Sequence, residues 1–160
     1  MKRSVLTLSG LAGLAMLAAT PAMASGAASC AKPTAADLDA QFNAFNSAWA
    51  TKSPDAVTAL FDDDAVLLAT VANVPRTDHA GIRDYFVKFL KNSPVGKIDT
   101  TTLKVGCDWA LRAGTWTVTL TDPANGKKTD VKARYTFLYQ LEDGKWKIEH
   151  LHSSMMPEKL

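Results

Sequence analysis

The stretch RYTFLYQLEDGKWKIEHLHSS, residues 134–154, decides the fold. Apolar and polar residues alternate on both sides of Asp143-Gly144, a pair typical of the two-residue turns of β-hairpins. The stretch therefore predicts two antiparallel strands, over about 129–141 and 145–153, joined at that turn.

The turn also predicts which side chains share a face. Counted outward from it, the pairs on one face are Leu141 with Trp146, Tyr139 with Ile148, Phe137 with His150, and Tyr135 with His152. This aromatic face is expected to point into the core, and both histidines with it. Leu138 and Leu151 fall on the opposite face and give it an apolar character that suits a dimer interface. A β-bulge in either strand would reverse the faces beyond it.

Helical patterns precede these strands. Thr34 can cap a long helix whose apolar residues recur at helical spacing: Leu38, Phe42, Phe45 and Trp49. Ser53-Pro54 starts a short second helix, and Thr77-Asp78 starts a third that ends at Ser93-Pro94.

Three more strands complete the predicted order. An apolar run predicts a strand over 62–70, between the second and third helices, and two further strands are expected over 100–112 and 114–122. Asn125-Gly126 is a hairpin signal that joins them to the strands above. Helices followed by a meander predict an α+β domain, with the helices on one face of a curved antiparallel sheet.

The first 24 residues have the pattern of a secretory signal peptide. Lys2 and Arg3 precede an apolar run over 5–19, and Ala22-Met23-Ala24 fits the cleavage site. The run is shorter than the roughly 20 residues that span a bilayer. We expect an exported protein, periplasmic or secreted, with no membrane contact after cleavage, a linker over 25–35 and one domain over 36–157.

The charge of the mature chain excludes one class of partner. Cleavage would remove Lys2 and Arg3 and lower the basic residues from 18 to 16, equal to the 16 acidic ones. A formally neutral domain without a basic run lacks the electrostatic footprint of a nucleic-acid-binding protein. We expect no nucleic acid partner.

Cys30 and Cys107 are the two cysteines of the chain. In an oxidising compartment an even pair is first interpreted as a disulfide, which could contribute about 4 kcal/mol for so long a loop. Lipidation of Cys30 is the alternative, although Ala27-Ala28-Ser29 lacks the Leu usual three residues before a lipidated cysteine.

The histidines allow two interpretations. A histidine on an apolar face is often a core residue with one hydrogen bond, but two at alternate positions near a strand end favour a pocket lining. A metal site would need one or two ligands beyond them. His79 lies at a helix start, and Asp62, Asp63 and Asp64 have the pattern of a solvated turn, so we predict no metal. The chain also lacks glycine-rich phosphate loops, Cys-x-x-Cys and flavin or haem signatures, so we predict no cofactor.

The motifs GIRDYFVKFL (81–90) and DGKWKIEHLHSS (143–154), with the long first helix, resemble the nuclear transport factor 2-like superfamily. Within it, the resemblance is greatest to the calcium/calmodulin-dependent protein kinase II association domain and its bacterial SnoaL-like and SgcJ/EcaC-type relatives. It covers about residues 36–157 and implies a cystatin-like cone: a bent antiparallel sheet, three helices in its concave face, a pocket at the wide end, and dimers or larger rings through the outer sheet face.

The resemblance also implies a pocket composition. The association domain carries carboxylate-binding arginines where this chain has Phe137, Ser153 and Trp116, so a less acidic or more aromatic ligand is expected unless Arg134, Arg112 or Arg83 enters the pocket. The residues expected to line the pocket are Trp49, Tyr85, Trp116, Tyr135, Phe137, His150 and His152.

Three functions remain open from the sequence. The favoured one is a homodimeric module that binds a small apolar or aromatic molecule. The second is an isomerase- or cyclase-like enzyme with His150 or His152 as general base and Tyr135 or Tyr85 as oxyanion donor. The third is a structural assembly module that acts through its outer sheet face.

Overall fold

The computed structural model describes Cys30 and residues 32–157, and its elements follow the predicted order closely. In chain order they are α1 (Ala35–Ala50), α2 (Pro54–Thr58), β1 (Phe61–Leu68), α3 (His79–Phe89), the 3-10 helix η1 (Leu90–Asn92), β2 (Val95–Val105), β3 (Trp109–Thr121), β4 (Lys128–Glu142) and β5 (Lys145–Met155).

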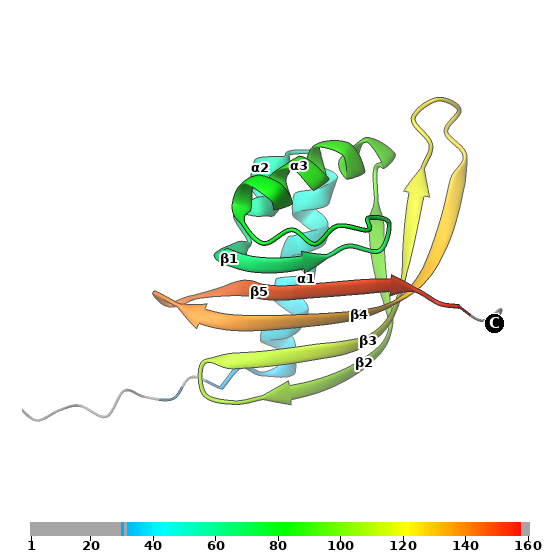
Figure 1. Cartoon of the computed structure of the whole chain (residues 1–160). Coiled ribbons are helices and arrows are strands. Elements are labelled where there is room, and N and C mark those ends of the chain that lie inside the picture. Colours follow the sequence, from blue (N-terminus) through cyan, green and yellow to red (C-terminus); the bar gives the residue numbers. More distant parts are fainter. Residues whose placement is uncertain (1–29, 31, 158–160) are drawn as a thin grey trace, which may run out of the picture.

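The strands form one mixed sheet in the order β1-β5-β4-β3-β2. The predicted meander is confirmed for β2 to β5, which pair antiparallel, whereas β1 adds at the edge, parallel to β5. The sheet is strongly bent, and the three helices cover its concave face (Figure 1). The predicted α+β architecture is therefore confirmed.

The helices begin where their capping residues stand. Thr34 and Asp37 form a reciprocal capping box at α1, Ser53 caps α2, and the Asp78 carboxylate accepts the Gly81 N–H at 2.7 Å at the start of α3. The apolar stripe of α1 is buried in the core, where the Phe45 ring lies 5.4 Å from that of Phe137. Capping residues therefore fix where the helices begin, and the packing of apolar side chains holds α1 on the sheet.

The predicted break between the strands near residue 113 was wrong. The chain reverses at 106–108 instead, and Gly114 lies inside β3. A register shift between Ile98 and Thr100 presses the β2 backbone against Gly114, where an added Cβ would meet the Thr100 carbonyl oxygen at 2.1 Å. Gly114 therefore marks a close backbone approach and not a turn.

Cys30 and Cys107 form a disulfide that joins the lead-in of α1 to the β2–β3 turn, across 77 residues of sequence. This pairing confirms the disulfide prediction and uses the thiol that lipidation would need. The predicted signal peptide over 1–24 lies outside the described residues, as does most of the linker over 25–35. In the part of the chain that the structure describes, every helix is too short or too polar to cross a membrane.

Candidate ligand-binding site

An apolar cavity lies at one end of the core, between α1, α3 and the concave face of the sheet. We call it the mouth cavity. Its walls are Trp49, Ala69, Thr70, Val71, Tyr85, Phe86, Phe89, Trp116, Val118, Leu120, Val131, Leu151 and Ser153. The space within them is about 30 Å³, which is room for only a few water molecules. Its walls are thus mainly aromatic and aliphatic.

Three of the predicted pocket residues line this cavity: Trp49, Tyr85 and Trp116. The Trp49 and Trp116 rings lie 5.9 Å apart, and Tyr85 stacks on Phe89 with 5.2 Å between ring centres. Burial raises the pKa of Tyr85 above its ordinary value, so its phenol is neutral at physiological pH. The wall is therefore uncharged.

Few polar atoms face this region, and most of them bond one another. The Trp116 indole N–H donates to the Ser153 hydroxyl at 3.1 Å, and the Thr70 hydroxyl also bonds Ser153. The Trp49 indole nitrogen is buried and has no hydrogen-bond partner among the described residues. A buried unpaired N–H is costly, which makes Trp49 a candidate donor to a bound molecule.

Tyr135 and Phe137 were predicted to line the pocket but are absent from the cavity wall. Both are buried in the core below it. The Tyr135 hydroxyl bonds the Thr101 hydroxyl at 2.8 Å and donates to the Thr100 carbonyl at 3.0 Å. Phe137 stacks on Tyr139 with 5.6 Å between ring centres. They support the site rather than contact its interior.

The predicted orientation of His150 and His152 was wrong. The register follows the prediction as far as Tyr139 opposite Ile148, but the next pair is Leu138 opposite His150, so Glu149 is an extra residue in β5. This β-bulge reverses every face beyond it. Leu151 and Ser153 are consequently 3% and 6% exposed and point into the core, whereas His152 is exposed.

Both histidines therefore lie on the outer face of the sheet and not in the mouth cavity. Their ring centres are 6.4 Å apart, and partial burial lowers the pKa of His150. Pairing places Val66 and Leu138 on either side of His150, and Leu111 beyond Leu138. A general base inside the cone, as the enzyme hypothesis needs, is not supplied by either histidine.

His79 lies apart from the other two, at the start of α3. Its Nε2 is 3.1 Å from the Phe61 carbonyl oxygen and 3.7 Å from the Asp63 carboxylate. These contacts join α3 to β1, and among the described residues His79 forms no cluster of possible metal ligands with His150 or His152. The three histidines therefore do not form a metal-binding set among the described residues.

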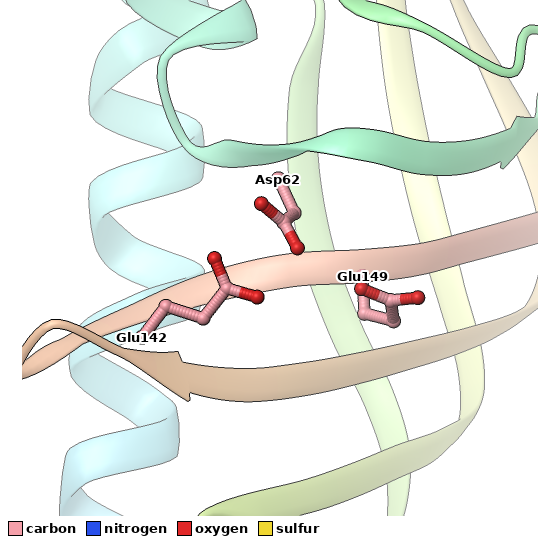
Figure 2. A group of neighbouring side chains, drawn as sticks. All are labelled: Asp62, Glu142 and Glu149. Atoms are coloured by element: carbon pink, nitrogen blue, oxygen red, sulfur yellow. The ribbon is translucent and has the colours of Figure 1, made fainter.

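One cluster that the sequence did not predict lies on the outer side of β1, β4 and β5. Carboxylate oxygens of Asp62, Glu142 and Glu149 lie within 4.8 Å of one another (Figure 2). The hydrogen bond that the protonated Glu142 carboxyl group donates to the Asp62 carboxylate is the main cause that raises the pKa of Glu142 to about 7 and lowers the pKa of Asp62. The two groups therefore share a proton near neutral pH.

The three arginines considered from the sequence lie outside the mouth cavity. Arg134 is exposed on the outer sheet face, and Arg83 pairs with Asp55 at 2.5 Å. Arg112 is 5% exposed and enters the core from β3, but it binds α1, through the Asp39 carboxylate at 2.8 Å and the Leu38 carbonyl at 3.1 Å. Its role is to hold α1 on the sheet.

Sequence reasoning missed a fourth arginine, Arg76. It borders an open groove of about 240 Å³, the mouth groove, which shares Val71, Tyr85 and Phe89 with the mouth cavity. Ala72, Arg76, Lys88 and Asn92 complete its walls. Arg76 reaches the groove because residues 69–76 fold back along β1, where Leu67 and Arg76 bond each other's backbones. No local sequence pattern signals that return.

Comparison with known proteins agrees with this architecture. Residues 42–148 match the SnoaL-like domain family. A protein from Xanthomonas campestris, provisionally named a calcium/calmodulin-dependent protein kinase II association domain, is 46% identical, with a TM-score of 0.77 over 79% of this chain and 91% of that one. No curated protein sequence matches the chain.

Two further solved structures are similar. A protein from Novosphingobium aromaticivorans, provisionally named an aromatic ring hydroxylase, is 25% identical, with a TM-score of 0.65 over 75% of this chain and 87% of that one. A nuclear transport factor 2-like superfamily protein from Salmonella enterica is 14% identical, with a TM-score of 0.67 over 78% and 92% of the two chains, and shows the shared fold. Other solved structures of this shape are described as cystatin-like.

Proposed function

The chain belongs to the SnoaL-like domain family, within the nuclear transport factor 2-like superfamily, and from this premise we propose that it is an exported module that binds a small apolar or aromatic molecule at its mouth. The observation that carries the proposal is that the aromatic-walled mouth cavity and the larger mouth groove lie next to each other and share the wall residues Val71, Tyr85 and Phe89. Ligand pockets are typically concave and mostly apolar, with few polar groups.

The volumes indicate how such a ligand binds. The mouth cavity alone is too small, since it has about a fifth of the volume of a cavity of about 150 Å³ that binds benzene in another protein. The mouth groove, at about 240 Å³, is large enough for one aromatic ring. A ligand that lies in the groove and displaces Val71, which is exposed at the boundary, would extend the cavity between Trp49 and Trp116.

A fluorescence titration tests the proposal, because Trp49 and Trp116 lie in the cavity wall. 4-Phenylbutanol is a suitable neutral probe, and we expect a saturable change in tryptophan emission. Ala72→Phe, which fills the groove, should weaken binding at least tenfold. Ala80→Phe, on the exposed side of α3, should bind like the wild type. Absence of saturable binding, or equal binding by Ala72→Phe, would refute the proposal.

The outer face of the sheet supports self-association as a second function. The outer sheet face carries a row of half-buried apolar side chains around His150: Val66, Leu68, Leu111 and Leu138. Leu151, which was predicted on this face, is in the core instead. The name of the Xanthomonas campestris relative as an association domain agrees with a homodimer or larger ring through this face. We propose it as the interface of this chain.

Sedimentation velocity tests whether the chain self-associates through this face of the sheet. Leu138→Glu places a charge at the centre of the row and should convert the assembly to monomers. Val87→Glu adds the same charge on α3, on the helix side of the sheet, and should leave the assembly intact. A wild-type protein that is monomeric at high micromolar concentration would contradict the proposed homodimer.

A further inference from the structure

The mouth groove is positively charged. Among its seven wall residues, Arg76 and Lys88 are the charged ones, and both are cations. Asp84 pairs with Lys88 at 3.4 Å on the exposed side of α3 but is not part of the wall. The sequence led us to expect a less acidic ligand because the arginines of the association domain are replaced. The groove supplies a cation from another position.

Arg76 is the less compensated of the two cations. It forms no salt bridge within residues 32–157, and its Nε is buried without a hydrogen-bond partner there. Among these residues, its side chain forms one hydrogen bond, from Nη1 to the Val74 carbonyl at 3.3 Å. Arg76 therefore brings to the groove wall a positive charge that no carboxylate of these residues pairs with, and a ligand carboxylate in the groove would supply a charge-assisted partner for its guanidinium.

The Arg76 side chain is also held in place. Its backbone N–H donates to the Leu67 carbonyl at 3.0 Å, and its carbonyl accepts from the Leu67 N–H at 2.8 Å. Its side-chain stem packs against the first turn of α3, where a Cβ added at Gly81 would lie 3.3 Å from the Arg76 Cδ. The charge of Arg76 also acts on Tyr85, whose pKa it lowers against the larger effect of burial. The guanidinium is thus fixed close to the aromatic wall.

The far end of the site has the opposite character. Beyond the shared residues Val71, Tyr85 and Phe89, the mouth cavity has no charged residue in its wall. The site as a whole therefore runs from a cationic groove to an aromatic cavity. A guanidinium presents parallel N–H donors that match a carboxylate, whereas an aromatic cavity takes an apolar tail.

We propose that the ligand class is an amphipathic carboxylic acid, with its carboxylate on Arg76, assisted by Lys88 and Asn92, and its aromatic or aliphatic tail in the mouth cavity. This inference rests on the proposed function, because it assigns the chemistry of the same site. The bound species is the carboxylate, and its recognition involves no covalent step. Arg76 acts as the specificity-determining residue.

A matched pair of probes tests the inference separately from the proposed function. Isothermal titration calorimetry with the full mature protein compares 4-phenylbutanoate with 4-phenylbutanamide, which differ in charge and little in shape. We expect the acid to bind at least tenfold more tightly than the amide, as charge-assisted hydrogen bonds exceed neutral ones. This preference should shrink between 50 and 500 mM NaCl, because salt screens the cation at an open groove.

Variants of Arg76 test whether this residue causes the preference for the acid over the amide. Arg76→Gln should abolish the preference for the acid and leave amide binding unchanged. Arg76→Lys should retain part of this preference, since lysine keeps the positive charge but lacks the parallel N–H donors of the guanidinium. Arg83→Gln removes an arginine that pairs with Asp55 outside the groove and should behave as the wild type.

Each other outcome has a distinct meaning. Equal binding of acid and amide by the wild type would overturn the carboxylate inference and leave the proposed function standing. A preference that persists in Arg76→Gln would overturn the assignment to Arg76. Failure of both probes to bind would overturn the proposed function and the inference with it.

Discussion

Leu138 of β4 pairs directly with His150 of β5 on the outer face of the sheet, although regular pairing from the hairpin turn would place Phe137 there. The extra residue is Glu149, and the shift moves Leu151 and Ser153 into the core and both histidines out of it. Both histidines therefore lie on the proposed interface, and the proposed ligand site depends on aromatic residues and Arg76.

Paired substitutions test the reversal of faces beyond Glu149. Leu151→Ala should lower the free energy of unfolding by about 2–5 kcal/mol, because it removes a buried side chain from a packed core. His152→Ala, at the next position, should change it by less than about 0.5 kcal/mol. Chemical denaturation measures both values. A large loss of unfolding free energy in His152→Ala with a small loss in Leu151→Ala would show instead that the strands pair in regular register, without a bulge.

His150 should make stability depend on pH. Partial burial lowers the pKa of His150 in the folded state, so the unfolded chain binds the proton more tightly. Its contribution to stability is therefore present above about pH 6.5, the ordinary value for histidine, and is lost as the pH falls below it. The groups facing it are His152 on β5, Val66 on β1 and Leu138 on β4.

The corresponding measurement is thermal unfolding at pH 7 and pH 5. His150→Gln should lose less stability than the wild type over this interval, whereas the exposed His152→Gln should retain most of the wild-type dependence. Identical pH dependence in His150→Gln and the wild type would show that His150 titrates alike in the folded and unfolded states.

The carboxyl cluster predicts the opposite pH dependence at higher pH. The raised pKa of Glu142, about 7, means that the folded state holds a proton that the unfolded state has released. Its stabilising contribution is therefore lost as the pH rises through about 7, whereas the lowered pKa of Asp62 adds stability that is already complete above its ordinary pKa and does not change over this range. Glu142→Gln keeps a hydrogen-bond donor for Asp62 at every pH and should unfold at a higher temperature than the wild type at pH 8.

Asp130→Asn is the matched control for this cluster. It removes the same charge on β4, and its amide oxygen can still accept the hydrogen bond from Thr119, now 2.7 Å long. Its effect on the unfolding temperature should be the same at pH 5 and pH 8. A wild-type advantage over Glu142→Gln at pH 8 would contradict proton sharing between Glu142 and Asp62.

The disulfide should contribute measurably to stability. The double variant Cys30→Ser/Cys107→Ser opens a link across 77 residues, and we expect it to lose about 2–4 kcal/mol of unfolding free energy. Urea denaturation of the wild type with and without a reducing agent should give a difference of the same size. A reduced wild type as stable as the oxidised form would contradict this expectation.

Helix starts and the last hairpin turn could be predicted from the sequence, because they depend on residues that are close together along the chain. Thr34, Ser53 and Asp78 cap their helices as predicted, and Asp143-Gly144 turns the last hairpin. These signals act over a few residues, so they can be recognised in the sequence without knowing how the strands pair.

The candidate site was less predictable because two of its determinants are long-range. Ile148 and Leu151 are both core-facing although three residues apart, which a regular strand does not allow, and this spacing was the available signal for the bulge. Arg76 had no such signal, since its position depends on the return of its loop along β1 at Leu67. Such contacts follow from the packed sheet and not from local pattern.

Native mass spectrometry of the gently purified protein, followed by denaturation of the same sample, is the most direct test of whether the mouth groove and mouth cavity bind a carboxylic acid. We expect a retained small molecule that is released on denaturation, carries a carboxylate, and is depleted in the groove-filled variant Ala72→Phe. A wild-type protein that is empty, and that also fails to take up 4-phenylbutanol or 4-phenylbutanoate, would contradict it and leave the outer sheet face as the working surface.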